Sequence, residues 1–227
     1  MEKAFKFEEE FDEVAIAIDY SEVLAKESIL YSVTKRLIDI VGSLCGIILL
    51  SPLFLIVAIL IKLDSKGPVI FKQTRIGKNS KPFNIYKFRS MKVESPNLST
   101  EEFKNASDFT TRVGKFIRKT SIDELPQLVN ILKGDMSIVG PRPVIEKEME
   151  LIELRKKYNI DILYPGITGW AQINGRDNVS TKEKVKYDYY YLNNRNIKFD
   201  IFIIFKTFIK VIKSEDIGVN IEEHKII

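Results

Sequence analysis

Cysteine and histidine are almost missing from this chain of 227 residues. Cys45, the only cysteine, lies inside an apolar run, and His224, the only histidine, lies three residues before the end of the sequence. Their scarcity excludes a disulfide framework, zinc sites built on cysteine or histidine, and Ser-His-Asp or Cys-His catalysis. Neither Gly-x-x-x-x-Gly-Lys-Ser/Thr nor Gly-x-Gly-x-x-Gly occurs, so the common glycine-rich nucleotide motifs are absent as well. Chemistry in this chain must rely on Asp, Glu, Arg and Lys.

Acidic residues predominate only at the start of the chain. Residues 1–27 contain nine acids and three lysines, whereas the whole chain has a formal charge of +4, so the remainder is strongly basic. This shift predicts an acidic N-terminal extension over residues 1–33. We divide the rest into a membrane segment at 34–66, a core at 67–217 and a C-terminal tail at 218–227.

A long apolar run follows the extension. Residues 40–61 contain no charged side chain, and about 20 residues of helix match a hydrocarbon core of about 30 Å. The run starts behind an acidic segment and no small-residue cleavage site follows it, so we expect a membrane segment and not a signal peptide.

Ser51-Pro52 interrupts the middle of this run. Proline removes a helical hydrogen bond and clashes with the preceding turn, so we expect a kink or break between two half-helices, with the Ser51 hydroxyl meeting a freed carbonyl. Basic residues flank both ends: Lys35, Arg36, Lys62 and Lys66. Positive charge therefore does not distinguish the ends, and the segment is either a re-entrant hairpin with both ends in the cytoplasm or one kinked spanning helix. The residues alone favour the spanning helix.

Residues 199–213 form a second apolar segment, which is also basic. The apolar residues at helical spacing are Phe202, Phe205, Phe208, Ile209 and Ile212, and the lysines on another face are Lys206, Lys210 and Lys213. Such a helix lies either in the interface of an anionic membrane or in a protein core with its lysines in solvent. The neighbouring membrane segment favours the interfacial position.

A β-hairpin is predicted at 69–76 and 82–88, because two short apolar runs flank the turn-forming residues 77–81. The hairpin is rich in cations: Lys72, Arg75, Lys78, Lys81, Lys87 and Arg89. These cations contact lipid phosphates, a nucleotide or only water.

Two adjacent acids, Asp123 and Glu124, lie between basic residues. An acid pair supplies a nucleophile or metal ligands, while cations such as Arg118 and Arg142 neutralise phosphoryl oxygens. Ser121 to Glu124 also has the spacing of a capping box, but Pro126 would then occupy a helical position where its missing N–H costs a hydrogen bond.

We therefore expect a helix that starts near Leu125 and stops at Gly134. Its predicted buried stripe is Leu125, Leu128, Val129 and Leu132. The acid pair would then lie at the N-terminus of this helix, where the partial positive charge favours both an ionised carboxylate and a bound phosphate.

Two rigid turns follow the acid pair. In the first, Pro141 and Pro143 fix the backbone around Arg142, which lowers the entropy that its guanidinium loses on binding a phosphate or a base edge. The second turn, residues 164–176, contains three glycines, the only tryptophan and Arg176. Taken alone, such a turn is more often structural than functional.

Together these segments resemble the bacterial sugar transferase family, the monotopic phosphoglycosyl transferases that start glycan assembly on polyprenol phosphate. The resemblance covers about residues 34–217 and rests on the segments 35–39, 51–52, 87–91, 118–127, 133–137, 140–143 and 169–176, in the family's order and spacing. It implies the small, catalytic-core form. The implied fold is α+β and mainly helical, with a re-entrant helix-break-helix at Ser51-Pro52, a small β-hairpin and a cytosolic core with interfacial amphipathic helices.

The resemblance also implies a reaction. Asp123 attacks the β-phosphate of a UDP-sugar, releases UMP and carries a covalent phosphosugar that passes to polyprenol phosphate, usually undecaprenol phosphate. Glu124 helps to hold Mg²⁺, the expected cofactor, or orients the acceptor, so that Asp123 and Glu124 are the expected metal ligands. The expected substrate-binding residues are Arg118, Pro141, Arg142, Pro143, Lys87 and Arg176.

The resemblance further implies a place in the cell and a set of partners. It implies the cytoplasmic face of the bacterial inner membrane, contact with membrane lipid, and the re-entrant geometry in place of the spanning helix. No nucleic-acid partner is expected. A homodimer, the identity of the sugar and the glycan pathway (capsule, exopolysaccharide or glycoprotein) stay open.

Two alternatives use the same residues differently. A membrane-anchored adaptor would bind anionic lipid or a partner protein through its basic surface and would need neither nucleotide turnover nor Asp123. A regulatory or scaffold subunit for another transferase would keep the fold, although the intact acid pair and Arg142 disfavour it.

Overall fold

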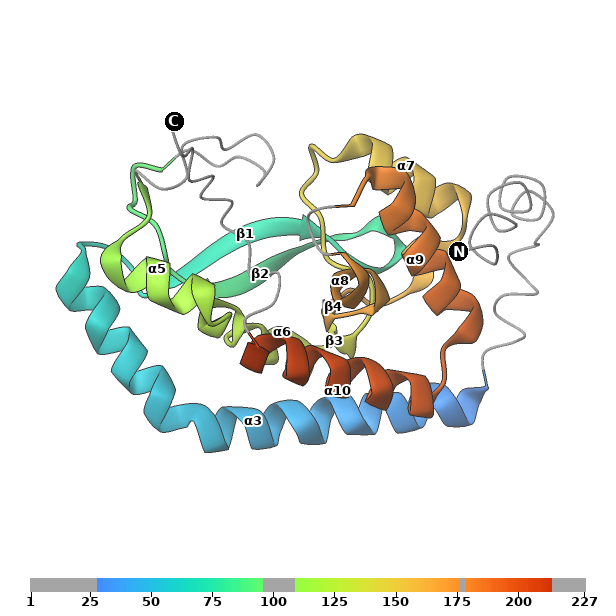
Figure 1. Ribbon diagram of the computed structural model, residues 1–227, viewed down its shortest axis with the longest axis horizontal. Helices are drawn as coiled ribbons and strands as arrows, with labels where there is room; N and C mark the ends of the chain where they lie inside the picture. The colour runs from blue at the N-terminus through green and yellow to red at the C-terminus, as the bar shows by residue number, and fades with distance from the viewer. Residues whose placement is uncertain (1–27, 96–108, 176–178, 214–227) are drawn as a thin grey trace, which may run out of the picture.

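The computed structural model describes residues 28–95, 109–175 and 179–213. In these ranges the chain is mainly helical, with an antiparallel hairpin and a short parallel pair of strands (Figure 1). The helices are α3 (Ile29–Asp64), α5 (Arg112–Lys119), α6 (Gln127–Lys133), α7 (Met149–Lys157), α8 (Trp170–Asn174), α9 (Thr181–Asn194) and α10 (Ile197–Lys213). The strands are β1 (Ile70–Ile76), β2 (Pro82–Phe88), β3 (Ser137–Val139) and β4 (Gly166–Thr168), and single 3₁₀ turns are η1 (Lys78–Ser80), η2 (Ile122–Glu124) and η3 (Ile160–Ile162).

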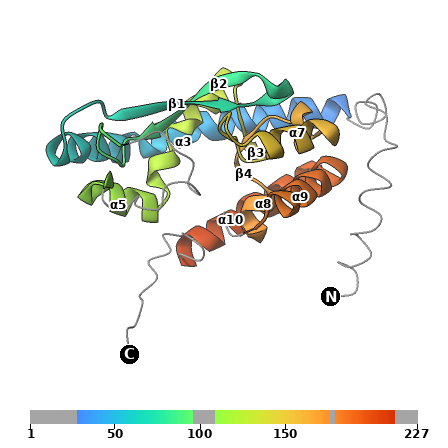
Figure 2. The same ribbon diagram turned by 90° about the horizontal axis from the view of Figure 1, so that it is seen from above.

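The predicted mainly helical α+β fold and the predicted hairpin are confirmed. β1 and β2 pair from Ile70 opposite Phe88 to Ile76 opposite Pro82. The parallel pair β3–β4 was not predicted, because each strand has only three residues. Figure 2 shows α8, α9 and α10 on one side of this pair, with α3 and the hairpin on the other side. Most of the acidic extension (residues 1–27) and the whole C-terminal tail (218–227) lie outside the described residues.

The long helix α3 bends but does not break (Figure 1). Pro52 lies inside it and has no N–H to donate to the carbonyl of Ile48, four residues earlier. The Ser51 hydroxyl donates to that same carbonyl at 2.8 Å. The expected role of Ser51 is thus confirmed. Of the expected kink or break, the helix shows a bend without a break, because the serine satisfies the group that proline leaves unpaired.

The apolar surface of α3 is exposed to an unusual extent. Only 11% of its most apolar stretch is buried, and Leu49 and Leu63 are 76% and 79% exposed. A core helix of a water-soluble protein buries such side chains, because each costs roughly 1.5–3 kcal/mol when left in water. The surface of α3 is therefore suited to lipid and not to a protein interior.

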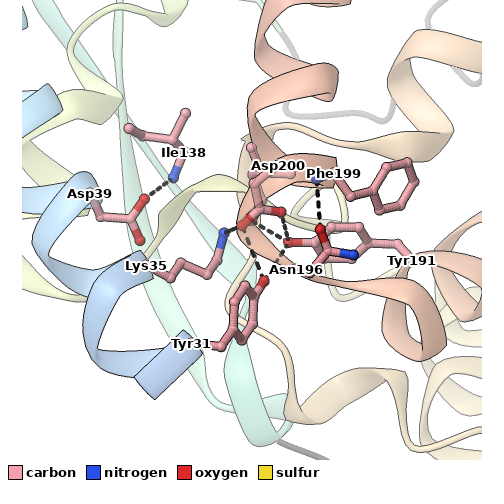
Figure 3. Close-up of polar contacts among 9 residues, drawn as sticks. Tyr31, Lys35, Asp39, Ile138, Tyr191, Asn196, Phe199 and Asp200 are labelled. Atoms are coloured by element: carbon pink, nitrogen blue, oxygen red, sulfur yellow. Dashed lines mark hydrogen bonds and ion pairs between the residues drawn. The ribbon is translucent and has the colours of Figure 1, made fainter. Parts of the chain in front are cut away.

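The N-terminal arm of α3 is fixed to the core by polar side chains (Figure 3). Lys35 forms an ion pair with the buried Asp200 of α10 at 2.9 Å, and Tyr31 donates to the same carboxylate at 3.1 Å. Asp39 accepts a hydrogen bond from the backbone N–H of Ile138 in β3 at 2.9 Å. Arg36 donates to two carbonyls at the end of α6, those of Ile131 at 2.7 Å and Leu132 at 3.0 Å.

The C-terminal arm of α3 contacts the same body. Val57 and Ile61 pack against Phe88 of β2 and Ile117 of α5. The Asp64 carboxylate accepts from the backbone N–H of Val113, in the first turn of α5, at 2.9 Å. Both arms of the bent helix are therefore held to one folded unit.

The aromatic face of α10 is exposed, as expected for an interfacial helix. Phe202, Phe205 and Phe208 are 42%, 60% and 64% exposed, while Ile203 on the opposite face is fully buried. Ile203 packs with Val139 of β3 in a small core. The predicted helix is confirmed, and its phenylalanines do not form a protein core.

Candidate active site

The acid pair lies on its own 3₁₀ turn, η2, between α5 and α6. Ser121 adopts a left-handed conformation (φ 55°) and makes no capping hydrogen bond, so the capping box does not form. Helix α6 starts at Gln127, directly after Pro126, and ends at Gly134, whose φ of 86° is the usual glycine stop. The prediction from Pro126 is confirmed in direction, although the helix starts two residues later than expected.

The predicted buried stripe of α6 is only partly right, because Leu128 packs against the core but is not fully buried. The residues buried on this helix are Gln127, Asn130 and Ile131, whereas Val129 is 40% exposed. Asn130 decides this orientation, because its amide donates to the carbonyl of Asn84 at 2.7 Å and accepts from the N–H of Tyr86 at 3.0 Å. Through these two bonds the Asn130 side chain pairs with the backbone of β2, which fixes α6 against the hairpin. The sequence signal for this orientation is the polar Asn130 inside the apolar run Leu-Val-Asn-Ile-Leu.

Asp123 is buried, with 9% of its surface exposed. Burial raises the pKa of its carboxyl from 3.8 to about 6, and the charge of Glu124 acts in the same direction. The cations of Lys87, Arg118 and Arg142 oppose this rise in pKa. The structure therefore brings together three of the cations expected from the sequence around the expected nucleophile, although they come from β2, α5 and the turn after β3.

Glu124 has a different environment from its neighbour. Its Oε1 atom lies 2.7 Å from the Lys87 Nζ and 3.5 Å from an Nη atom of Arg142. Two ion pairs fix the direction of this carboxylate. The two acids therefore differ in environment: Asp123 is poorly solvated, and Glu124 is ion-paired with two cations.

The turn that carries Arg142 is rigid. Pro141 and Pro143 are buried, and the Arg142 side chain is 44% exposed. The preceding Gly140 lies against the second turn so closely that a Cβ on it would come within 2.2 Å of the carbonyl oxygen of Tyr164. The backbone of Gly166 donates to the Pro141 carbonyl at 2.8 Å. Gly166 and Gly169 of the 164–176 turn therefore have a structural role, which is to let the two turns pack backbone to backbone.

A buried ion pair that the sequence did not predict contacts the backbone of the turn at Arg142. Arg155 of α7 donates twice to one Asp188 oxygen of α9, at 3.0 and 2.7 Å, and also donates to the Arg142 carbonyl at 2.9 Å. Both residues are buried, at 8% and 1% exposure. In the sequence Arg155 is one of several basic residues on a charged helix, so no local signal distinguishes it.

The remaining predicted residues lie elsewhere. Arg176 is outside the described residues. Ser51 and Pro52 belong to the apolar stretch of α3 and contribute to its bend and not to the acid pair. Arg89, one of the hairpin cations, donates to the carbonyls of Ser65, at 2.7 Å, and Lys66, and so secures the end of α3.

The acid pair is compatible with Mg²⁺ only if a substrate completes the site. Within the ranges 28–95, 109–175 and 179–213 no cluster of three or more Asp, Glu, His or Cys side chains occurs that could hold a metal. Mg²⁺, however, is usually bound by one or two carboxylates together with substrate phosphates and water. The donor set of Asp123 and Glu124 matches that second arrangement.

A buried carboxylate with a raised pKa, next to an ion-paired partner and three cations, is suited to phosphoryl chemistry. The carboxylate can attack phosphorus, and the cations can neutralise the equatorial oxygens of the transition state.

Comparisons with known proteins agree with this chemistry. The profile of one protein family, "Bacterial sugar transferase", matches residues 30–214. The chain is 43% identical over 183 residues to the UDP-N-acetylgalactosamine-undecaprenyl-phosphate N-acetylgalactosaminephosphotransferase of Aeromonas hydrophila. It is 47% identical over 189 residues to the UDP-glucose:undecaprenyl-phosphate glucose-1-phosphate transferase of Escherichia coli (strain K12).

The matches cover most of this chain but differ in how much of each relative they cover. Both of those alignments cover 78% of this chain, but only 43% and 39% of the relatives, so the chain spans about two fifths of their length. The exopolysaccharide production protein ExoY of Sinorhizobium fredii is 40% identical over 190 residues, which cover 77% of this chain and 84% of that protein. With the matched profile extending from α3 to α10, the chain belongs to the bacterial sugar transferase family.

Proposed function

We propose that this protein transfers a sugar 1-phosphate from a UDP-sugar to a polyprenol phosphate, undecaprenol phosphate by the names of its relatives, and releases UMP. The observation that carries the proposal is the buried Asp123, with its raised pKa, among Lys87, Arg118 and Arg142. Such a transfer would be the first membrane step of glycan assembly, and the likeness to ExoY favours an exopolysaccharide.

The proposed reaction has two displacements at phosphorus. In the first, an Asp123 oxygen forms a bond to the β-phosphorus, the bond from that phosphorus to the bridging oxygen breaks, and the electron pair leaves with UMP. In the second, a phosphate oxygen of the lipid attacks the same phosphorus and the Asp123 carboxylate leaves. Arg118 and Arg142 hold the phosphate oxygens, and Lys87 fixes Glu124 so that it can orient the acceptor.

Asp123 and Glu124 would hold Mg²⁺ together with oxygens of the diphosphate. The ion would supply neutralisation of negative charge on the phosphates.

The direct test is UMP release by the detergent-solubilised full chain, measured with a panel of UDP-sugars and undecaprenyl phosphate. We expect UMP release with one or a few of these sugars. The adaptor alternative predicts no release with any of them, while binding to anionic vesicles persists. That pattern would overturn the proposal.

The raised pKa of Asp123 predicts an acid limb in the pH dependence of the first displacement. Only the ionised carboxylate attacks, and its pKa is raised from 3.8 to about 6, so the single-turnover rate should fall about tenfold per pH unit below about pH 6. Lys87→Gln should move the midpoint upward, because the lysine cation lowers the pKa of Asp123. A rate that stays constant from pH 5 to pH 7 would contradict the assignment.

We further propose that α3 is re-entrant and that the core faces the cytoplasm. One folded unit binds Lys35 and Arg36 at one arm and Asp64 at the other, and a single unit cannot lie on both sides of a bilayer. At about 1.5 Å per residue, the 36 residues of α3 extend about 54 Å. That length exceeds the roughly 30 Å of a hydrocarbon core, so a bent helix can enter and return.

Cysteine labelling tests this topology. In a Cys45→Ser chain, Ser28→Cys before α3 and Ser80→Cys at the hairpin turn should both react with an impermeant maleimide only from the cytoplasmic side. Inside-out vesicles and intact cells give the two sides, and permeabilised cells control for accessibility. Labelling of position 28 from outside while position 80 reacts only from inside would establish a spanning helix.

A further inference from the structure

Arg75 lies on the same face of the hairpin as Lys87. Residues directly opposite each other in an antiparallel pair share a face, as do alternate residues of one strand. The pairs on this face are Phe71 with Lys87, Gln73 with Ile85, and Arg75 with Phe83. Lys87 forms an ion pair with Glu124 at 2.7 Å, so this is the face of the hairpin that looks toward the acid pair.

The guanidinium of Arg75 is fixed beside the Arg142 turn. Its Nε and Nη2 atoms donate to the Gln73 side-chain oxygen at 3.0 and 2.7 Å, and its Nη1 atom lies 3.5 Å from the Pro143 carbonyl oxygen. The next residue, Ile76, donates its N–H to the Val144 carbonyl at 2.8 Å. This hydrogen bond joins the end of β1, which carries Arg75, to the Pro-Arg-Pro turn, which carries Arg142, and we treat the two segments as one unit.

This unit carries two arginine cations that repel each other. The hydrogen bonds that Arg75 makes within the described part of the chain go to neutral oxygens. Burial and the like charge of Arg142 lower the pKa of Arg75 to about 10, so it stays a cation near neutral pH. The carboxylates of Glu148 and Glu124 oppose this fall in pKa. Glu148 also accepts from the backbone N–H of Ile145 at 2.9 Å, and Glu124 also pairs with Lys87 and Arg142. Like charges held together at a partly buried site are stabilised by an anion bound between them.

We propose that Arg75 binds the phosphate that leaves with the nucleotide, so that Arg75 and Arg142 together hold the diphosphate of the UDP-sugar. This inference rests on the proposed function. The Arg142 cation lowers the pKa of Asp123 and also that of Arg75, so it lies close to both residues. The β-phosphate must meet Asp123, so the next phosphate of the substrate reaches Arg75, on the far side of Arg142.

The test is nucleotide binding to the purified full chain, by calorimetry with UDP and with UMP in the presence of Mg²⁺. Arg75→Gln should weaken the binding of both nucleotides about 10- to 100-fold, because a charge-assisted contact to a phosphate is lost. Lys72→Gln is the matched control, since Lys72 lies on the same strand but pairs with Tyr86 on the opposite face. It should bind both nucleotides as the wild type does.

Each outcome of the binding test is informative. Equal UMP affinity of Arg75→Gln and Lys72→Gln overturns the inference, and so does a loss for UDP with unchanged UMP, which would place Arg75 on the β-phosphate. If Arg75→Gln does not fold, Arg75→Lys decides: it keeps the charge but not the planar fork and should weaken UMP binding several-fold. A wild-type chain that binds neither nucleotide and releases no UMP overturns the proposed function itself.

Discussion

Asp123→Asn should reduce UMP release by about 10⁴-fold, because an amide cannot form the covalent phosphosugar on which the proposed reaction depends. The measurement is UMP release by the solubilised full chain with its best UDP-sugar and undecaprenyl phosphate. Intact mass without the lipid should show a sugar-phosphate adduct on the wild type and none on the variant. Asp161→Asn, the same change on η3, is the control. UMP release at the wild-type rate by Asp123→Asn would rule out this residue as the nucleophile.

The same variant should be more stable than the wild type near pH 8. The pKa of Asp123 is about 6 in the folded protein and near its ordinary value of 3.8 in the unfolded chain. The unfolded chain therefore loses this proton first as the pH rises, and the stability of the wild type falls between about pH 4 and pH 6. At about 1.4 kcal/mol per pKa unit the penalty is about 3 kcal/mol above pH 6, and asparagine removes it.

Denaturant unfolding at pH 8 and at pH 4 checks this sign. We expect Asp123→Asn to unfold at a higher denaturant concentration at pH 8 and to lose most of that advantage at pH 4. A variant that is inactive and also less stable at pH 8 would indicate that Asp123 acts mainly through structure. Loss of activity with a gain in stability is typical of a residue placed for chemistry.

Arg155→Met should destabilise the core by about 3–5 kcal/mol, because it leaves the buried Asp188 without its cation. That is a large part of the 5–15 kcal/mol by which a domain is usually stable. Arg155 also holds the Arg142 carbonyl at 2.9 Å, so UMP release should fall in the fraction that remains folded. Lys156→Met, the adjacent exposed residue of α7, controls for the loss of a charge on the same helix.

A double variant separates the two roles of Arg155. Arg155→Met with Asp188→Leu leaves no buried charge unpaired and should recover much of the lost stability. It does not restore the hydrogen bond to Arg142, so UMP release should stay low. Recovery of both quantities would show that the contact to the Arg142 carbonyl has no effect on the reaction.

Local chemistry made several features of the site predictable. Pro126 excludes the earlier helix start whatever surrounds it, Gly134 ends the helix by its own backbone freedom, and the turn residues 77–81 define the hairpin. The orientation of α6 was not predictable in this way. It depends on Asn130 meeting β2 and on Leu128 packing against Gly46 of α3, two contacts between distant segments.

The gathering of cations around the acid pair also depends on tertiary structure. The resemblance assigned roles to Lys87, Arg118 and Arg142, but only the fold shows that they surround Asp123. The pair Arg155–Asp188 joins residues 33 positions apart on two helices, and Arg75 reaches the site only through the register of the hairpin. None of these contacts has a signature in the local sequence.

In the proposed re-entrant arrangement, the polar contacts of α3 link the position of the Asp123 carboxylate to the bilayer. Arg36 holds the end of α6 and Asp39 holds β3, so the depth at which α3 enters the lipid would set the height of Asp123 above it. A lipid phosphate lies at a fixed level in the headgroup layer, and one helical turn amounts to about 5.4 Å. In the proposed reaction, a shift of one turn would separate the carboxylate from its acceptor while leaving every residue of the site intact. The rate of the second displacement should therefore depend on membrane thickness.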